Sequence, residues 1–273
     1  MTTIVGVHGI GNYHFVPEAD GSVESATEAV SCIWSSALGH EVRVAYYAHL
    51  LHRGTAQGAD DVEFLDENAQ DLLVDWIDQL AQGGVPQGPR TARARAAGDW
   101  LVRHMGKQAL GTALKFVREV STYLDSEPRR QQARESVAGT VASVFAGNGD
   151  RPRIVIAHSL GTVVAYETLW QHPELEADLL LTLGSPLAMP TVIFDRLDPK
   201  PVDSRGRRPP SVAAWANLAD AGDIVAIPRD GLSPHFRGLT SDNPAITIDR
   251  NAFHAVARYL AAPETAAALG PYL

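Results

Sequence analysis

The chain has little cysteine and no long hydrophobic run. Its single cysteine, Cys32, excludes an intrachain disulfide and any zinc site built from several cysteines. No stretch reaches the roughly 18 consecutive apolar residues of a transmembrane helix. The N-terminal residues MTTIVGVHG lack the basic and apolar regions of a secretory signal. Together these absences predict a cytoplasmic protein with no transmembrane segment.

Lysine is also scarce, which excludes two classes of nucleotide-binding protein. Only three of the 23 basic residues are lysines, namely Lys107, Lys115 and Lys200. None of them follows a tyrosine by four positions, as in the Tyr-x-x-x-Lys motif of short-chain reductases, and Gly106-Lys107-Gln108 lacks the Ser or Thr of a P-loop. The net charge of −9 gives no support for a nucleic-acid partner.

The remaining composition is that of a globular protein, with 45% hydrophobic and 20% charged residues over 273 positions. Short apolar runs typical of buried strands alternate with helical patterns, which predicts an α/β fold with a mostly parallel central sheet flanked by helices. The expected strands are 3–8, 41–49, 153–157, 179–183, 212–218 and 246–248. The expected helices are 23–38, 160–171, 191–197 and one that begins at 253.

Between the second and third expected strands lies a long segment with helical patterning alone. Several leucines, Trp76 and Ile77 recur there at helical spacing, and further helices are expected over 91–125 and 129–146. We therefore expect a single domain over 1–273, interrupted by a helical insertion at 60–146.

The most informative motif is A-H-S-L-G, which lies between an apolar run ending at Ala157 and a helical pattern beginning at Leu160. A serine on such a sharp strand-to-helix turn is expected to have an exposed Oγ at the carboxyl edge of the sheet, beside the positive end of the helix. Ser204 also begins an S-x-G pattern, but no strand precedes it. Ser159 is thus the candidate nucleophile, and a structural turn serine is the alternative interpretation.

A His-Gly pair follows the first expected strand, in the sequence VGVHGIGN at 5–12. An acyl-transfer enzyme needs two backbone N–H groups directed at the developing oxyanion. The candidates are Leu160, directly after the nucleophile, and Ile10 in this glycine-rich loop. The same loop is similar to a dinucleotide-binding loop, but its spacing differs from G-x-G-x-x-G.

A catalytic serine needs a base and a carboxylate that orients the base. When the serine lies on this kind of turn, the acid follows it in the chain and the histidine follows the acid. The loop after the expected strand 212–218 offers two aspartates. Asp223 is the candidate acid, and Asp220 is the candidate brace of the loop. Of the two histidines further along, His254 lies at an apolar helix and is the candidate base, whereas His235 has no anchoring element.

The histidines outside the candidate triad are expected to have structural rather than catalytic roles. His8 is expected to brace the loop that carries Ile10, and His158 is expected to line the pocket beside the nucleophile. His49 and His52 are spaced i, i+3, but no carboxylate motif accompanies them. We therefore expect no metal and no organic cofactor.

Taken together, VHGIG, AHSLG, the GDIV loop and a late histidine resemble the α/β-hydrolase superfamily, in particular small serine lipases and esterases. The resemblance covers about 1–50 and 150–262 and leaves out the helical insertion. It implies an α/β-hydrolase fold in which the third residue of H-G-I-G, Ile10, supplies an oxyanion N–H. Minimal bacterial lipases also carry a small residue at the place of Ala157. Insertions in this superfamily often cover the site, so 60–146 is expected to form a helical cap.

The expected activity is cleavage of a small-molecule or lipid carboxylic ester through a Ser-His-Asp triad and an acyl-enzyme. A thioesterase, amidase or peptidase would use the same triad, and a non-catalytic binding protein could share the fold. The oligomeric state is left open. Large apolar residues of the insertion either line an acyl pocket or pack the cap's own core: Trp76, Trp100, Leu101, Met105, Phe116 and Tyr123. Four arginines either contact anionic lipid or form a solvated face: Arg90, Arg93, Arg95 and Arg103.

Overall fold

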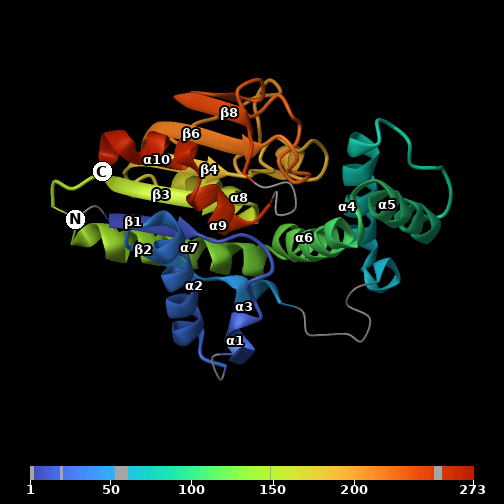
Figure 1. Cartoon of the computed structure of the whole chain (residues 1–273), viewed down its shortest axis with the longest axis horizontal. Helices are drawn as coiled ribbons and strands as arrows, with labels where there is room; N and C mark the ends of the chain where they lie inside the picture. Colours follow the sequence, from blue (N-terminus) through green and yellow to red (C-terminus); the bar gives the residue numbers. More distant parts are fainter. Residues whose placement is uncertain (1–2, 19–20, 53–60, 148, 249–253) are drawn as a thin grey trace. The chain divides into compact units, whose positions relative to one another are not determined.

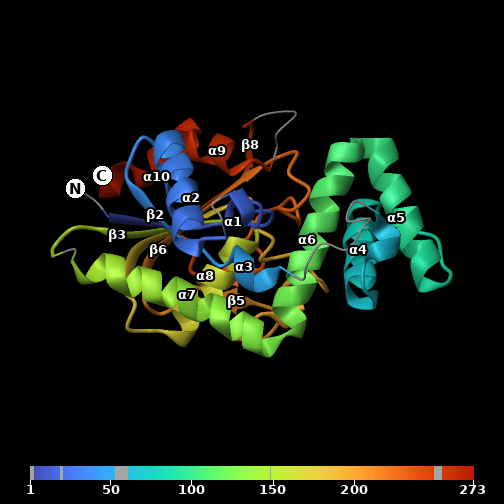
Figure 2. The same ribbon diagram turned by 90° about the horizontal axis from the view of Figure 1, so that it is seen from below.

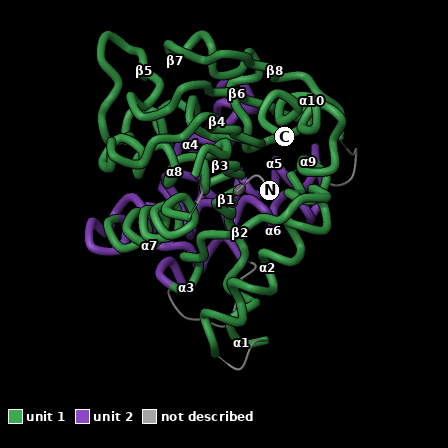
Figure 3. Tube along the Cα trace, turned by 90° about the vertical axis from the view of Figure 1, so that its left-hand side faces the viewer, with its two compact units in different colours: residues 1–49, 131–273 green, residues 50–130 purple. Residues whose placement is uncertain are grey.

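The computed structural model of the chain describes residues 3–18, 21–52, 61–147, 149–248 and 254–273. The chain divides into two compact units, which Figure 3 distinguishes by colour. Unit 1 consists of Met1–His49 and Gln131–Leu273, and unit 2 is Leu50–Arg130. Every described strand lies in unit 1, whereas the described elements that lie wholly in unit 2 are helices.

Unit 1 is built on a six-stranded sheet with the strand order β2-β1-β3-β4-β6-β8. Each neighbouring pair is parallel, so the predicted α/β class with a parallel central sheet is confirmed (Figure 1). The strands are β1 (Thr3–Val7), β2 (Val42–Ala45), β3 (Arg153–His158), β4 (Ala177–Leu183), β6 (Val212–Asp220) and β8 (Ser241–Ile246). Two short strands, β5 (Gly206–Arg207) and β7 (Phe236–Arg237), form a separate parallel pair.

Helices cover both faces of this sheet (Figure 2). One face carries α2 (Val23–Leu38), α9 (Val256–Leu260) and α10 (Pro263–Leu269). The other carries α8 (Leu160–Gln171) and α7 (Glu127–Ala146), most of which belongs to unit 1. The smaller helical segments of this part of the chain are α1 (Phe15–Glu18), α3 (Ala48–Leu51), η2 (Phe194–Arg196) and η3 (Gly270–Tyr272).

The main core lies between the sheet and the face covered by α2, α9 and α10. Ile4, Ile156 and Leu181, from the neighbouring inner strands β1, β3 and β4, are at most 1% exposed there, and Trp34 of α2 packs in the same cluster. Because helices bury both faces of the sheet, the sequences of its central strands are continuous apolar runs and do not alternate between apolar and polar residues.

Two expected strands differ in the structure. The strand expected over 41–49 ends at Ala45, and α3 begins at Ala48. The hydroxyls of Tyr46 and Tyr47, which lie between them, donate to the backbone carbonyls of Asn12 and His8 and draw the chain toward the loop after β1. The strand expected over 246–248 is instead β8, which ends at Ile246. Its sequence SDNPAI is polar because it is an edge strand, where proline is tolerated.

Two expected helices also differ. The helix expected over 191–197 is reduced to η2, and Thr191 has a left-handed φ of 57°. The helical stretch expected over 91–125 is divided at Gly106, whose φ is 85°. The α-helical hydrogen bonds cannot continue through this conformation, so two helices, α5 and α6, take its place.

Unit 2 is a small helical assembly. It contains η1 (Val62–Phe64), α4 (Glu67–Leu80), α5 (Arg90–Met105) and α6 (Lys107–Asp125). Trp76 and Phe116 are fully buried, with ring centroids 4.9 Å apart, which favours the packing interpretation over an acyl pocket for these two residues. Unit 2 ends at Arg130, whereas the expected insertion extends to residue 146.

The arginines at the start of α5 have acidic partners in the same unit. Arg90 pairs with Glu67 at 2.9 Å, and Arg95 pairs with Glu63 at 2.7 Å. All four side chains are at least 42% exposed, as expected for a solvated helix face. Over the parts of the chain that the structure describes, no helix has the length and apolarity needed to cross a membrane.

Candidate active site

The carboxyl ends of the parallel strands bring the candidate residues to one edge of the sheet. Gly9 follows β1, Ser159 follows β3, Asp223 follows β6, and His254 lies between β8 and α9. The strand after β1 in the chain, β2, lies on one side of β1, and β3 lies on the other. In open parallel sheets, such a reversal of strand order leaves a crevice at the carboxyl edge, where ligands bind.

Ser159 occupies a strained turn between β3 and α8. Its φ of 55° and ψ of −132° lie outside the backbone regions that residues with a Cβ ordinarily adopt. The turn is held because the Ser159 N–H donates to the carbonyl of Leu183 at 3.0 Å. α8 then passes so close to β1 that a Cβ on Gly161 would lie 2.4 Å from the carbonyl oxygens of Val7 and His8.

Ser159, His254 and Asp223 form one hydrogen-bonded chain. His254 Nδ1 lies 2.8 Å from Asp223 Oδ2, and His254 Nε2 lies 2.8 Å from Ser159 Oγ. Because an ionised carboxylate only accepts, the proton of a neutral imidazole is assigned to Nδ1, and Nε2 is left to accept from the serine hydroxyl. Asp223 is fully buried, and the His254 side chain is 9% exposed. Ser159 is also fully buried, so the exposed Oγ expected from the sequence is not observed.

Three donors surround the Asp223 carboxylate. The Val225 N–H donates to Oδ1 at 2.9 Å, while His254 and the Tyr259 hydroxyl each donate to Oδ2 at 2.8 Å. Gly184 at the end of β4 makes room for the carboxylate, since a Cβ there would lie 2.8 Å from Oδ2.

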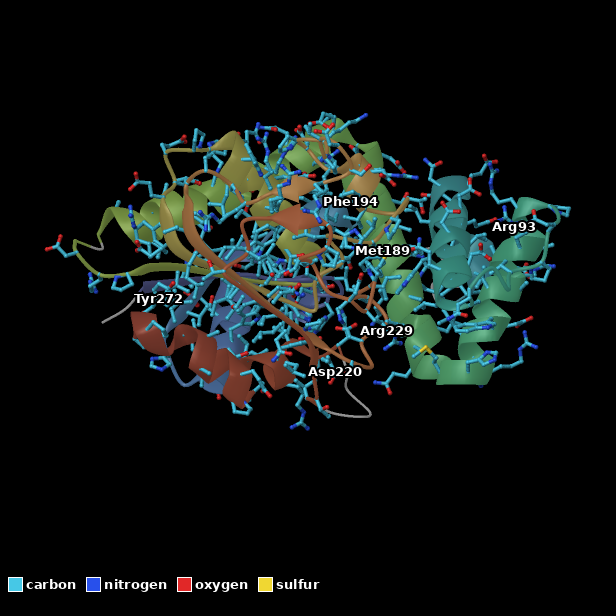
Figure 4. All side chains as sticks on the ribbon, turned by 90° about the horizontal axis from the view of Figure 1, so that it is seen from above. Arg93, Met189, Phe194, Asp220, Arg229 and Tyr272 are labelled. Carbon is cyan, nitrogen blue, oxygen red and sulfur yellow. The ribbon has the colours of Figure 1, made fainter. Side chains whose placement is uncertain are left out.

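Asp220 has a different role in the structure. The sequence predicted Asp220 in the loop after the strand, but the structure places it as the last residue of β6. Its two carboxylate oxygens each accept a backbone N–H at 2.7 Å, from Gly222 and Ile248. Arg229 donates to the carbonyl of Ala221 at the same turn, and Figure 4 labels the side chains of Asp220 and Arg229. Asp220 therefore braces the loop and does not contact His254.

The loop after β1 lies directly against the nucleophile. A Cβ on Gly9 would lie 2.6 Å from the Cβ of Ser159. The Gly9 carbonyl accepts from His8 Nδ1 at 2.7 Å and from the Asn12 amide at 2.9 Å. In a trans peptide the carbonyl and the following N–H point in opposite directions, so these two bonds also fix the direction of the Ile10 N–H. Among the described residues, neither the Ile10 nor the Leu160 N–H has a hydrogen-bond acceptor.

His8 is a buried neutral histidine. Its Nε2 accepts from the Tyr47 N–H at 3.1 Å, so its Nδ1 carries the proton that is donated to Gly9. Burial lowers its pKa to about 4, and the charge of His49 acts in the same direction. The interpretation of His8 as a brace of this loop agrees with these contacts.

His158 packs against the candidate base. Its ring centroid lies 4.7 Å from that of His254 and 5.8 Å from that of Tyr259. Burial lowers the pKa of His158 well below its ordinary value, and the charge of His254 lowers it further. His158 therefore adds no positive charge beside His254 near neutral pH.

The remaining candidates lie elsewhere. His235 contacts Asp230 at 3.7 Å and the ring of Phe194 at a centroid distance of 5.9 Å, and does not join the triad chain. Phe194 and Met189, both labelled in Figure 4, belong to the buried segment after β4. Ser204 is exposed. The described residues include no group of three His, Cys, Asp or Glu side chains that could hold a metal ion.

Sequence reasoning missed Asn12 and Tyr259. Asn12 lies within the glycine-rich loop, where asparagine is an ordinary turn residue. Tyr259 lies in an apolar helix, where aromatic residues usually pack in a core. Neither position carries a motif, because the function of each side chain depends on a neighbour that only the fold supplies. Comparison of the chain with protein-family models, with curated proteins and with solved structures gave no match.

Proposed function

We propose that this protein is a serine hydrolase of the α/β-hydrolase superfamily that cleaves carboxylic esters. The observation that carries the proposal is the chain of two 2.8 Å hydrogen bonds from Ser159 Oγ through His254 to Asp223. A buried carboxylate, an imidazole and a serine in this order are the parts needed to turn a hydroxyl into a nucleophile.

In the proposed first step, Ser159 Oγ attacks the ester carbonyl while His254 Nε2 takes its proton. The carbonyl electron pair moves to the oxygen, which accepts from the Ile10 and Leu160 N–H groups. Collapse of this intermediate expels the alcohol, which takes the proton from His254, and leaves an acyl-enzyme on Ser159. Asp223 holds the imidazole in position and stabilises its positive charge.

In the second step, His254 takes a proton from water, and the resulting hydroxide attacks the acyl carbonyl. The second intermediate collapses, the carboxylic acid leaves, and Ser159 regains its proton. Atoms and charge balance with ester and water alone.

Two further observations support the proposal. Ser159 has the strained backbone and the position at a helix N-terminus that are typical of a nucleophile elbow. The Ile10 and Leu160 N–H groups are without acceptors in the described structure, as an oxyanion hole requires.

The test is hydrolysis of a short p-nitrophenyl ester, together with labelling by a fluorophosphonate probe. Ser159→Ala should abolish labelling and lower kcat by a factor on the order of 10⁶, as triad knockouts do. Ser204→Ala is the matched control, because Ser204 is exposed and follows no strand of the central sheet; it should label and turn over as the wild type does.

Labelling that persists in Ser159→Ala would contradict the assignment of the nucleophile. A wild-type protein that neither labels nor hydrolyses esters or thioesters would instead favour the non-catalytic binding protein. A panel of matched esters, thioesters and amides then identifies the leaving group, which the triad itself does not select.

A further inference from the structure

Tyr259 occupies a buried position beside the acid of the triad. It is fully buried in α9, five residues after His254 in the chain. Its hydroxyl donates to Asp223 Oδ2 at 2.8 Å, and this is the oxygen that also accepts from His254. The same hydroxyl accepts from the backbone N–H of Asp220 at 2.8 Å.

These two contacts determine the direction of the hydroxyl proton. The Asp220 N–H is only a donor, so it uses a lone pair of the phenol oxygen. The single proton of the hydroxyl is then directed at Asp223. Burial raises the pKa of Tyr259, and the charge of Asp223 raises it further, so the donor keeps its proton at every pH at which an esterase is assayed.

The surroundings hold the tyrosine ring in this position. A Cβ on Gly184 would lie 3.1 Å from the Tyr259 ring and 2.8 Å from Asp223 Oδ2, so the glycine lets both groups share one space. The hydroxyl of Thr265 donates to the Tyr259 carbonyl at 2.6 Å and anchors the end of α9.

We propose that Tyr259 is a positioning residue that acts through Asp223 and sets how strongly the triad acid attracts the proton on His254. This inference rests on the proposed function. By donating to the oxygen that His254 also uses, the tyrosine withdraws part of the carboxylate charge and fixes the orientation of the carboxylate.

The sign of the effect follows from this arrangement. Without the phenol donor, the carboxylate is less stabilised, so either Asp223 or His254 takes up a proton more readily. Protonation of either Asp223 or His254 inactivates the triad, and in the absence of the phenol donor this protonation takes place at a higher pH. Within the described ranges, the other titratable groups that face the pair are His158, which is buried and neutral, and Asp220, on the far side of the hydroxyl.

The test compares Tyr259→Phe with the wild type in the pH profile of kcat/KM. The acid limb should move to higher pH by about one unit, the size expected for losing one hydrogen bond to a charged group. Tyr166→Phe is the matched control: it also removes a buried tyrosine hydroxyl, which donates to the Arg207 carbonyl at 3.0 Å, and should leave the acid limb in place.

A second measurement does not depend on activity. The low-field proton NMR signal of His254 Nδ1–H reports the hydrogen bond to Asp223, and its pH titration in Tyr259→Phe should shift in the same direction. If Ser159-dependent turnover is absent but this titration moves, the proposed function fails and the positioning role stands. If the titration and the acid limb both match the wild type, the positioning role is wrong.

A third measurement covers the case in which Tyr259→Phe does not fold. Wild-type protein produced with 3-fluorotyrosine keeps every hydroxyl, while ring fluorine makes the phenol a stronger donor. The His254 titration should then move to lower pH, opposite to the phenylalanine variant. A titration that does not move, or that moves to higher pH, would overturn the inference.

Discussion

At the residue scale, two aspartates three positions apart carry out different tasks because their neighbours differ. Asp223 accepts from one backbone N–H and from the side chains of His254 and Tyr259. Asp220 accepts only backbone N–H groups, from Gly222 and Ile248, in the contacts that the structure describes. The first arrangement orients an imidazole, whereas the second ties two chain segments together.

This difference predicts two distinct phenotypes for the same substitution. Asp223→Asn should lower kcat by about 10⁴, because an amide no longer holds the imidazole in the tautomer that accepts from Ser159. Asp220→Asn should keep most of kcat but lower the free energy of unfolding by about 1–3 kcal/mol, because an amide NH₂ faces a backbone donor. Ester turnover and urea denaturation of both variants measure the two effects. A large loss of kcat in Asp220→Asn with little loss in Asp223→Asn would show that Asp220 is the acid of the triad.

At the scale of elements, the site depends on how closely α8 approaches β1. The helix that begins at Leu160 packs its first turn against the backbone at the end of β1, where Gly161 has no side chain to obstruct it. The same approach places the loop after β1 beside Ser159. The parallel arrangement of the sheet therefore matters for function, since it assembles the nucleophile and the proposed oxyanion donors from strands far apart in sequence.

Gly161→Ala should abolish ester turnover and fluorophosphonate labelling, because its Cβ would lie 2.4 Å from two backbone oxygens that cannot rotate away. The free energy of unfolding should fall by about 1–3 kcal/mol, as for other overpacked sites. Gly139→Ala in α7 is the control: nothing lies within 4 Å of its Cβ, so it should stabilise the helix by up to about 1 kcal/mol. Equal effects at both positions in thermal denaturation would argue against this close approach.

At the scale of the whole molecule, the chain holds two compact units, and unit 1 contains every residue of the proposed triad and oxyanion hole. Unit 1 also buries two neutral histidines, His8 and His158, whose pKa values burial lowers. Each of them binds a proton less readily in the folded state than in the unfolded chain. Folding is therefore coupled to pH through these two side chains.

The free energy of unfolding should fall as the pH decreases from about 6.5 toward 4. In this window the unfolded chain protonates His8, whereas the folded protein does not, so stability is lost at lower pH, by a quantity on the order of 3 kcal/mol for this residue. His8→Asn keeps a donor near Gly9 but cannot titrate, so its unfolding free energy should depend less steeply on pH. Urea denaturation at several pH values measures the slope; an unchanged slope in the variant would refute the coupling.

Much of the fold and of the candidate site could be predicted from local pattern. β3, α8 and the turn at Ser159 carry strong signals, because an apolar strand, a small residue and an apolar helix follow one another without interruption. β8 and η2 could not be predicted in the same way. An edge strand needs no apolar periodicity, and the segment after β4 is buried without being regular.

The sequence by itself determined the chemical types at the site: a serine on a strand-to-helix turn, two aspartates after the expected strand 212–218, two later histidines and an early His-Gly loop. Only the tertiary structure decided which of them meet. Asp223 and His254 are separated by about thirty residues, and their contact depends on where β6 and α9 lie on the sheet. The role of Tyr259 is likewise set by the 2.8 Å contact with Asp223, because a hydrogen bond depends on distance and direction in space, which residue identity alone does not specify.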